Sequence, residues 1–345
     1  MHQLEGRPIV EVNRGDLTES FHDVAACASS ARGDILFSVG DIDAPVFLRS
    51  SAKPFIAAAT IEAGVREAFG LDMHEIAVMA ASHSGEPFHV EAVRSILEKA
   101  GLGVSDLQCG AHVPYNEAAA HAMLRAHETP SALHNNCSGK HAGILALCKV
   151  MGADVTTYLD IENPAQQRIL AFCARTSDDD PATWPLGIDG CGIPVYATTL
   201  RKAALAFARF ASLEGLDRRD AMALLIVRDA MVSHPEYVGG TGEFDSVLMR
   251  AAGGSIACKV GAEGVHGVAV IPQGVGYASK VIDGASRGRS PVTVAALRHL
   301  GALSEPQLTE VRAFAHPIVY NRAGRAVGDI RVAANFAVEE ASSRT

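Results

Sequence analysis

The sequence predicts an α+β fold in which the two ends of the chain complete one antiparallel sheet. Strand-like periodicity fills residues 1–50 and returns over 255–340, whereas the period between 51 and 254 is mostly helical. No linker, internal repeat or low-complexity segment interrupts the 345 residues. Helices segregated from an antiparallel sheet define this fold class. We therefore expect a single unit over 1–345, with the helical layer inserted into the sheet.

Four strands are predicted in the first fifty residues, because short apolar runs alternate there with turn signals. Glycine beside aspartate, as in Gly15-Asp16 and Gly33-Asp34, is typical of such turns. The predicted strands cover residues 8–12, 20–28, 34–40 and 45–49.

The middle of the chain is rich in alanine and leucine at helical spacing, and capping residues are frequent there. Helices are predicted over residues 53–70, 89–101, 116–128, 140–152, 164–175, 200–213 and 218–232. A strand-like segment at 185–197 interrupts them. In the tail, strands are predicted over 267–273, 276–282, 317–321 and 327–334, with one helix at 290–303.

Composition excludes several classes of protein. Hydrophobic residues make up 48% of the chain, so a sizeable core can form. A formal net charge of −9 argues against a nucleic-acid partner. No apolar run approaches the ~20 residues of a membrane helix, and the first residues lack a secretory signal pattern. Seven scattered cysteines are not a disulfide framework, so we expect a cytoplasmic protein with no membrane partner.

A serine and a lysine at S-x-x-K spacing form the first candidate site. Ser50 and Lys53 stand at a strand-to-helix junction, almost one helical turn apart and therefore on one face. A neutral lysine amine there could accept the hydroxyl proton, which arginine cannot do. The chain holds 23 arginines but only seven lysines, so a lysine at this position indicates a role that arginine cannot fill. The alternative is a serine that caps a helix beside a surface lysine.

Two further motifs follow in the order found in serine penicillin-recognising enzymes. Ser82 lies on a polar loop between two predicted helices, in the place of S-D-N. Lys259 comes just before the returning sheet, in the place of K-T-G. Both motifs are degenerate, but order, spacing and context agree, so we interpret Ser82 and Lys259 as a second serine–lysine pair.

Two cysteine motifs form a candidate metal site. Cys137 and Lys140 stand one turn apart at a helix start, and Asp189 and Cys191 share one face of a glycine-rich extended segment. Thiolates, a carboxylate and an amine suit tetrahedral zinc, although lysine must first lose its proton. The alternative is that these cysteines are small buried apolar residues. Three flanking histidines are candidates for orienting roles: His83, His134 and His141.

The motifs together resemble the Rhizobium-type (class 3, asparaginase II) L-asparaginases. The matching segments are RSSAKPF, ASHSGEPFH, HNNCSGKHAG, GIDGCGIP and the stretch around Lys259, within a resemblance that runs from about Val10 to Asn335. The resemblance implies a serine β-lactamase/penicillin-binding-protein-like fold and a single catalytic unit. It also implies hydrolysis of L-asparagine to L-aspartate and ammonia, and a homodimer.

The resemblance also assigns roles to the candidate residues. It implies that Ser50 is the nucleophile, that Lys53 is its base, and that Ser82 and Lys259 relay a proton to the departing ammonia. The implied zinc ligands, with Asp189 beside them, are Cys137, Lys140 and Cys191. Serine already supplies the nucleophile, so zinc is expected to orient the substrate or the loops.

Other functions stay open on the sequence. In a zinc-dependent amidohydrolase, metal-bound water would attack and Ser50 would only cap a helix. A cytoplasmic β-lactamase-like amide hydrolase would act on another substrate. A non-catalytic zinc-binding or regulatory protein could keep the same fold. The preference for asparagine over glutamine is also open.

Overall fold

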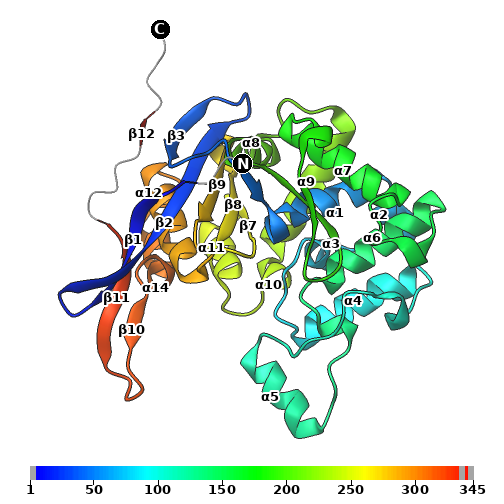
Figure 1. Cartoon of the computed structure of the whole chain (residues 1–345). Coiled ribbons are helices and arrows are strands. Elements are labelled where there is room, and N and C mark those ends of the chain that lie inside the picture. The colour runs from blue at the N-terminus through cyan, green and yellow to red at the C-terminus, as the bar shows by residue number, and fades with distance from the viewer. Residues whose placement is uncertain (1–4, 334–338, 341–345) are drawn as a thin grey trace. The chain divides into compact units, whose positions relative to one another are not determined.

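The computed structural model describes residues 5–333 and 339–340, and the chain divides into two compact units. One, the sheet unit, comprises Met1–Ser51, Ala197–Gly215 and Ala251–Thr345. The other, the helical unit, comprises Ala52–Tyr196 and Leu216–Arg250 (Figure 1). The predicted α+β class is confirmed, because segments from both ends of the chain build one antiparallel sheet. That the whole chain acts as one catalytic unit stays a prediction.

The sheet unit is organised around a long central strand, β2. The strands run in the order β10-β11-β1-β2-β9-β8-β7, and β3 pairs with both β2 and β12. All of these pairs are antiparallel. The strands are β1 (Arg7–Arg14), β2 (Leu17–Ser30), β3 (Ile35–Val39), β7 (Ile256–Val260), β8 (Val265–Val270), β9 (Val275–Val281), β10 (Ile318–Tyr320), β11 (Ala326–Val332) and β12 (Glu339–Glu340).

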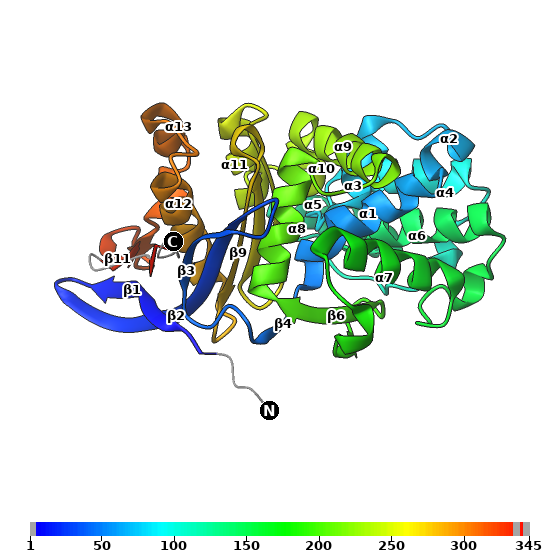
Figure 2. The ribbon, with the colours of Figure 1, turned by 90° about the horizontal axis from the view of Figure 1, so that it is seen from above.

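Helices lie on both faces of this sheet, α8 (Leu200–Ser212) on one and α12 (Arg289–His299) on the other (Figure 2). Helix α8 approaches β9 so closely that a Cβ at Gly276 would lie 2.0 Å from the carbonyl oxygen of Ala204. Only glycine permits that approach. Two short helices follow α12: α13 (Glu305–Glu310) and α14 (Arg312–Ala315).

The helical unit is built around two buried helices. Helix α1 is buried from Lys53 to Ile61, and α6 is buried from Ser138 to Cys148. Helix α1 begins at the candidate residue Lys53 and α6 follows the candidate residue Cys137, so this part of the site is anchored in the core of the unit. The helices are α1 (Lys53–Glu62), α2 (Val65–Phe69), α3 (Met73–Met79), α4 (Pro87–Lys99), α5 (Glu117–Ala126), α6 (Ser138–Met151), α7 (Pro164–Ser177), α9 (Arg218–Ser233) and α10 (Pro235–Val238).

Helix α11 (Phe244–Ala252) and strand β6 (Pro194–Thr199) each cross a boundary between the units along the chain. Helix α11 crosses the boundary after Arg250. Strand β6 begins beside β5 (Leu186–Ile188) and ends beside β4 (Pro45–Phe47).

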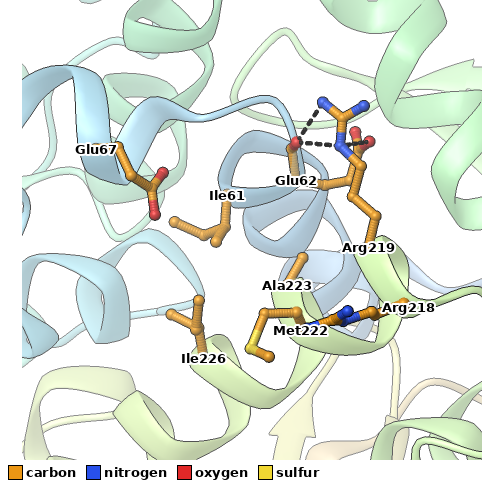
Figure 3. A pocket seen from close by; sticks show the side chains of 8 residues that line it. All are labelled: Ile61, Glu62, Glu67, Arg218, Arg219, Met222, Ala223 and Ile226. Atoms are coloured by element: carbon orange, nitrogen blue, oxygen red, sulfur yellow. Dashed lines mark hydrogen bonds and ion pairs between the residues drawn. The ribbon is translucent and has the colours of Figure 1, made fainter.

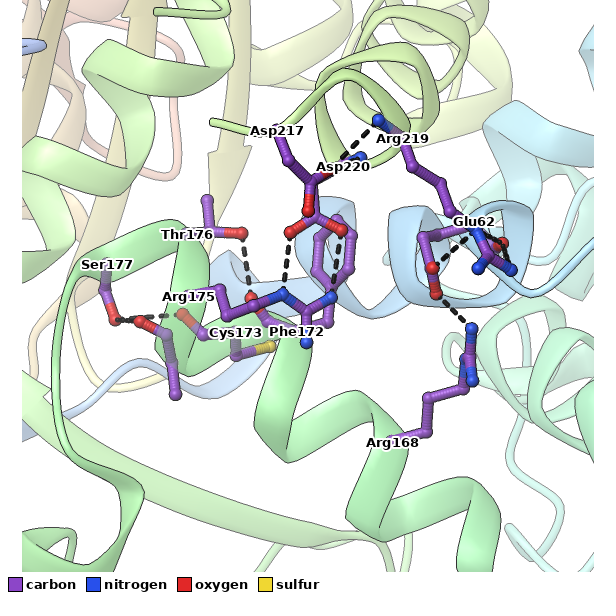
Figure 4. Close-up of polar contacts among 11 residues, drawn as sticks. Glu62, Arg168, Phe172, Cys173, Arg175, Thr176, Ser177, Asp217, Arg219 and Asp220 are labelled. Atoms are coloured by element: carbon purple, nitrogen blue, oxygen red, sulfur yellow. Dashed lines mark hydrogen bonds and ion pairs between the residues drawn. The ribbon is translucent and has the colours of Figure 1, made fainter. Parts of the chain in front are cut away.

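A buried carboxylate holds the far end of α1 in the helical unit. Glu62 accepts from Arg168 Nη2 at 2.5 Å and pairs with Arg219 Nε at 2.8 Å (Figure 4). Beside it, the guanidinium of Arg175 donates two hydrogen bonds to the carboxylate of Asp220, at 2.7 and 2.9 Å. These bonds join α1, α7 and α9, so polar contacts reinforce the apolar packing.

The structure corrects several sequence predictions. The helix predicted over 53–70 is two helices, because Gly64 adopts a left-handed φ of 92° that ends α1. Lys259 lies inside strand β7, not before the sheet. The helices α3, α10, α11, α13 and α14 and the strands β7 and β12 were not predicted. Residue 334 of the predicted strand 327–334 lies outside the described residues. Over the described ranges, no helix combines the length and apolar character that membrane spanning requires.

Candidate active site

Ser50 lies in the 3-10 helix Arg49–Ala52, which leads directly into α1. Its neighbour Ser51 is buried, and the Ser51 hydroxyl donates to the carbonyl oxygen of Leu48 at 2.6 Å. Ser50 is partly exposed, so it is the more accessible residue of the pair. The preceding Arg49 has a positive φ of 51°, which is strained for a side chain of this size. Backbone strain of this kind clusters at functional sites.

Lys53 is the first residue of α1, and its amine is buried against two loops. Its Nζ donates to the carbonyl oxygen of Ala81 at 2.5 Å, to Ser82 Oγ at 3.0 Å and to the carbonyl oxygen of Asn136 at 3.4 Å. The structure therefore brings Lys53 together with Ser82, which lies on the loop between α3 and α4.

Burial shifts Lys53 toward loss of its proton. Burial lowers the pKa of Lys53, while the negative charge of the nearby Cys137 sulfur opposes this shift and Lys140 adds to it. The net pKa is lowered. Desolvation disfavours the charged amine, and a neutral amine is the form that can accept a proton from a serine.

The candidate metal ligands also meet in the helical unit. Cys137 is the N-cap residue of α6, Lys140 lies in its first turn, and Cys191 is in the turn between β5 and β6. Lys140 Nζ lies 3.1 Å from Cys191 Sγ. All three residues are buried. Asp189 belongs to the same turn as Cys191, and its carboxylate accepts from the amide of Gly190 at 2.7 Å, so it shapes that turn.

The pKa values of the two sulfurs are shifted in opposite directions. A hydrogen bond from Cys191, with the positive Lys53 and Lys140, holds the pKa of Cys137 well below its usual value despite burial. The same hydrogen bond and burial raise the pKa of Cys191. Burial lowers the pKa of Lys140, but the two sulfurs outweigh it and raise that pKa overall.

This donor set fits zinc. Thiolate sulfur and amine nitrogen are ligands of the soft-to-borderline type that zinc prefers, and all three lie in one buried cluster. Metal binding would require Lys140 and Cys191 to release their protons, so it would weaken at low pH.

Two predicted site residues belong to the sheet unit. Lys259 is fully buried in β7, and its Nζ donates to the carbonyl oxygen of Val260 at 3.0 Å. Ser50 is in the same unit, whereas Lys53, Ser82 and the metal candidates are in the helical unit. The pairing of Ser50 with Lys53 and that of Ser82 with Lys259 stay predictions.

Some residues around the site were found only in the structure. Ser138, the first residue of α6, bonds to His83, and Asn136 supplies a carbonyl to Lys53. Gly139 permits the start of α6 to lie against α3, because a Cβ there would be 2.1 Å from the carbonyl oxygen of Val78. Gly139 in the CSGKHAG motif was the signal in the sequence for this approach.

The three flanking histidines have different roles. The His83 ring lies between Ser138 at the start of α6 and the amide of Gly85 in the α3–α4 loop. His134 accepts from the amide of Ser131 at 3.1 Å within its own turn, and His141 bonds to the hydroxyl of Tyr158 at 2.7 Å.

A hollow of about 400 Å³ lies in the helical unit at the other end of α1 (Figure 3). Ile61, Met222 and Ala223 line its apolar part, and Glu67 and Arg218 stand at its edge. The ten residues of α1 span about 15 Å. The hollow therefore lies away from Lys53 and contains none of the predicted site residues.

Sequence comparison identifies the family. The family model for L-asparaginase II matches residues 10–332, nearly the whole chain. The chain belongs to the L-asparaginase II family, which places it among the hydrolases. No curated protein sequence matches it.

Solved structures resemble the chain at low identity. Mglu is 15% identical with a TM-score of 0.38, and the match covers 83% of this chain and 68% of Mglu. In other Mglu structures the chain spans less than two thirds of the matched chain, 62% and 61%. A Bacteroides dorei DSM 17855 protein described as a β-lactamase is 17% identical, with a TM-score of 0.39 over 74% of this chain and 84% of that one. The D-alanine carboxypeptidase AmpC of Burkholderia cenocepacia is 12% identical, with a TM-score of 0.36 over 81% and 93%.

Proposed function

We propose that the protein is an L-asparaginase that hydrolyses L-asparagine to L-aspartate and ammonia through a covalent seryl intermediate. The observation that carries this proposal is the buried amine of Lys53. It stands three residues after the accessible Ser50, and its Nζ lies 3.0 Å from Ser82 Oγ. Membership of the L-asparaginase II family supports the choice of substrate.

Ser50 and Lys53 carry out the first step of the proposed reaction. The Ser50 oxygen bonds to the side-chain amide carbon of asparagine, while the neutral amine of Lys53 takes the hydroxyl proton. The amide carbonyl becomes an oxyanion, which backbone N–H groups at the start of α1 would stabilise. The carbon–nitrogen bond then breaks, and a β-aspartyl ester of Ser50 remains.

Ser82 delivers the proton that the departing ammonia needs. Because Lys53 donates to Ser82 Oγ, the proton that Lys53 takes from Ser50 can pass to Ser82 through one hydrogen bond. Ser82 passes its own proton to the leaving nitrogen and receives in exchange the proton that Lys53 took from Ser50, so Lys53 is neutral again. We assign Lys259 to the same relay, as a second lysine that can exchange a proton with Ser82. Water then adds to the ester, and Ser50 is restored as aspartate leaves.

Cys137, Lys140 and Cys191 would hold zinc in the proposed enzyme, with Asp189 beside them. When bound, zinc supplies a positive centre that replaces the released protons and fixes the ligands in place. The acyl transfer belongs to Ser50 and the lysines, so zinc has a positioning role.

An ammonia-release assay tests the proposal. The wild-type protein and Ser50→Ala are each given asparagine, glutamine and simple amides, with and without chelator, and a chromogenic β-lactam in parallel. Asparagine turnover that disappears in Ser50→Ala supports the seryl mechanism. Turnover that survives in Ser50→Ala but disappears with chelator would replace it with a zinc amidohydrolase. Turnover of the β-lactam alone would assign another substrate.

We also propose a homodimer, which the resemblance to the Rhizobium-type enzymes implies. The chain has a mass of 36.2 kDa, so light scattering on the purified protein should report twice that mass. A monomer at micromolar concentration contradicts this part of the proposal.

A further inference from the structure

A hydrogen bond joins the residue after Ser82 to the residue after Cys137. His83 Nε2 lies 2.8 Å from Ser138 Oγ, and both side chains are fully buried. One residue belongs to the serine loop between α3 and α4, and the other opens α6. The two parts of the candidate site are therefore in direct contact through side chains that take no part in the chemistry.

The direction of this bond is fixed by its neighbours. The amide of Gly85 donates to His83 Nδ1 at 3.2 Å, so Nδ1 carries a lone pair and the ring proton is on Nε2. His83 Nε2–H donates to Ser138 Oγ, and the Ser138 hydroxyl donates onward to the carbonyl oxygen of Leu133 at 2.9 Å. Burial holds the pKa of His83 well below its usual value, so the ring stays neutral.

Two further contacts hold His83 in place, one to a face of its ring and one to its backbone amide. His89 stacks on it with ring centroids 4.9 Å apart and planes at 18°. The amide of His83 donates to the carbonyl oxygen of Asn136 at 3.2 Å. A buried ring with a packed face and both nitrogens bonded cannot turn without losing hydrogen bonds, so it transmits displacement between its partners.

We propose that the His83–Ser138 hydrogen bond couples the metal ligands to the serine loop, so that metal bound at Cys137 orders Ser82. The proposal rests on the proposed function for the metal ligands. Fixing Cys137 fixes the adjacent Ser138, and Ser138 holds the ring next to Ser82. Such coupling is reciprocal, so an ordered serine loop also strengthens metal binding. His83 and Ser138 are positioning residues.

Hydrogen–deuterium exchange on the full-length protein, with and without one equivalent of Zn²⁺, tests this coupling without any assay of turnover. In the wild type, zinc should slow exchange of the amides of residues 82–86 about 10-fold, within the usual range of coupling between sites. In Ser138→Ala this protection should disappear, and zinc affinity should fall about 10-fold. Ser177→Ala is the matched control, because its buried hydroxyl bonds only within α7.

A second pair of variants covers the case in which Ser138→Ala folds poorly. In His83→Gln the side-chain amide can replace Nε2–H as donor to Ser138, whereas in His83→Asn the shorter amide can replace only the Nδ1 acceptor. Glutamine should keep the zinc-dependent protection and asparagine should lose it. A purely structural role would make the two variants alike.

The outcomes separate this proposal from the proposed function. Protection of residues 82–86 that persists in Ser138→Ala overturns the coupling, and would assign it to Lys53, which also contacts both loops. Zinc binding to the wild type without protection overturns it as well. If zinc protects residues 82–86 but the protein hydrolyses no amide, the proposed function is wrong and the coupling is supported. A wild type that binds no zinc ends both metal proposals, while the ammonia assay still decides the seryl mechanism.

Discussion

Lys53 Nζ lies 3.0 Å from the hydroxyl of Ser82, a serine 29 positions further along the chain. The S-x-x-K spacing predicts Ser50 as the partner of this lysine, so the structure adds a second serine to its surroundings. A lysine that faces the hydroxyl of a neighbouring serine can pass on a proton as well as accept one. The predictions for Lys53 follow from that geometry.

Replacement of Lys53 should separate charge from basicity. Lys53→Arg keeps the positive charge but cannot deprotonate, so kcat should fall about 10²- to 10⁴-fold, nearly as far as in Lys53→Ala. Wild-type activity should rise toward alkaline pH through the lowered pKa of Lys53, because the neutral fraction grows in that direction. Steady-state kinetics from pH 6 to 10 checks both. Lys149→Arg, at an exposed position, is the control. An active Lys53→Arg enzyme leaves only an electrostatic role.

Two adjacent serines provide a matched pair for the nucleophile. Ser50→Ala should lose nearly all turnover and keep its thermal midpoint. Ser51→Ala should keep kcat but lower the free energy of unfolding by about 1 kcal/mol, because its buried hydroxyl bonds to Leu48. Ammonia release and urea unfolding measure the two effects. If Ser50→Ala retains a tenth of kcat, or if Ser51→Ala is the inactive variant, the assignment of the nucleophile is wrong.

Local features of the fold were readable from the sequence, whereas long-range ones were not. The helices α4 to α9 follow apolar periodicity and caps, so they were predicted to within a few residues. Helix α3 was missed because it has seven residues, although Asp72 and Glu75 form the capping box that marks its start. Strand β7 was missed because Ile256–Val260 has no alternation, being buried throughout most of its length.

The same distinction applies to the site. The residue types at Ser50, Lys53, Cys137 and Cys191 are evident from motifs that lie on one turn or one loop. The contact of Lys53 with Ser82 depends on how the α3–α4 loop folds back over α1, which no local pattern contains. The His83–Ser138 bond is of the same kind, since its partners are 55 positions apart.

Zinc binding should depend on particular cysteines. The purified wild type should carry close to one zinc per chain, and Cys191→Ala should lose it, since the change removes the sulfur beside Lys140. Cys27→Ala, at a buried sulfur in β2, should keep it. Metal analysis and a chelator competition measure the difference. The stripped wild type should keep measurable kcat and lose mainly in KM, the signature of lost uniform binding. If chelation abolishes kcat and zinc alone restores it, the metal takes part in the chemical step.

Loss of the Glu62 charge should weaken the packing of α1 against α7 and α9. Glu62→Gln keeps the shape of the side chain but leaves Arg168 and Arg219 without their shared carboxylate. We expect the free energy of unfolding to fall by about 1–3 kcal/mol, at the lower end because Arg219 is largely exposed. Urea unfolding measures the change. Glu67→Gln, an exposed change on α2, should stay within about 0.5 kcal/mol of the wild type. Equal effects of the two variants would remove the special role of Glu62.

Stability should fall on mild acidification because of the buried histidine pair. Burial lowers the pKa of His89 to about 4, from the 6.5 of an ordinary histidine, and lowers that of His83 as well. Between pH 4 and pH 6.5, His89 is protonated in the unfolded chain but neutral in the folded protein. The stabilisation is therefore complete above pH 6.5 and is lost as pH falls toward 4, by about 2 kcal/mol at pH 5 for His89 alone.

Urea unfolding of the wild type and two variants at pH 7, 6 and 5 tests this effect. His89→Gln removes the titrating ring, so its free energy of unfolding should vary less with pH than that of the wild type over this interval. His121→Gln, at an exposed position on α5, should follow the wild-type slope. The interval stays above the range in which ordinary carboxylates take up protons, so the difference between the slopes belongs to the histidine. Parallel slopes for all three proteins would mean that His89 is protonated in the folded state, and the stacked pair with His83 would then not be neutral.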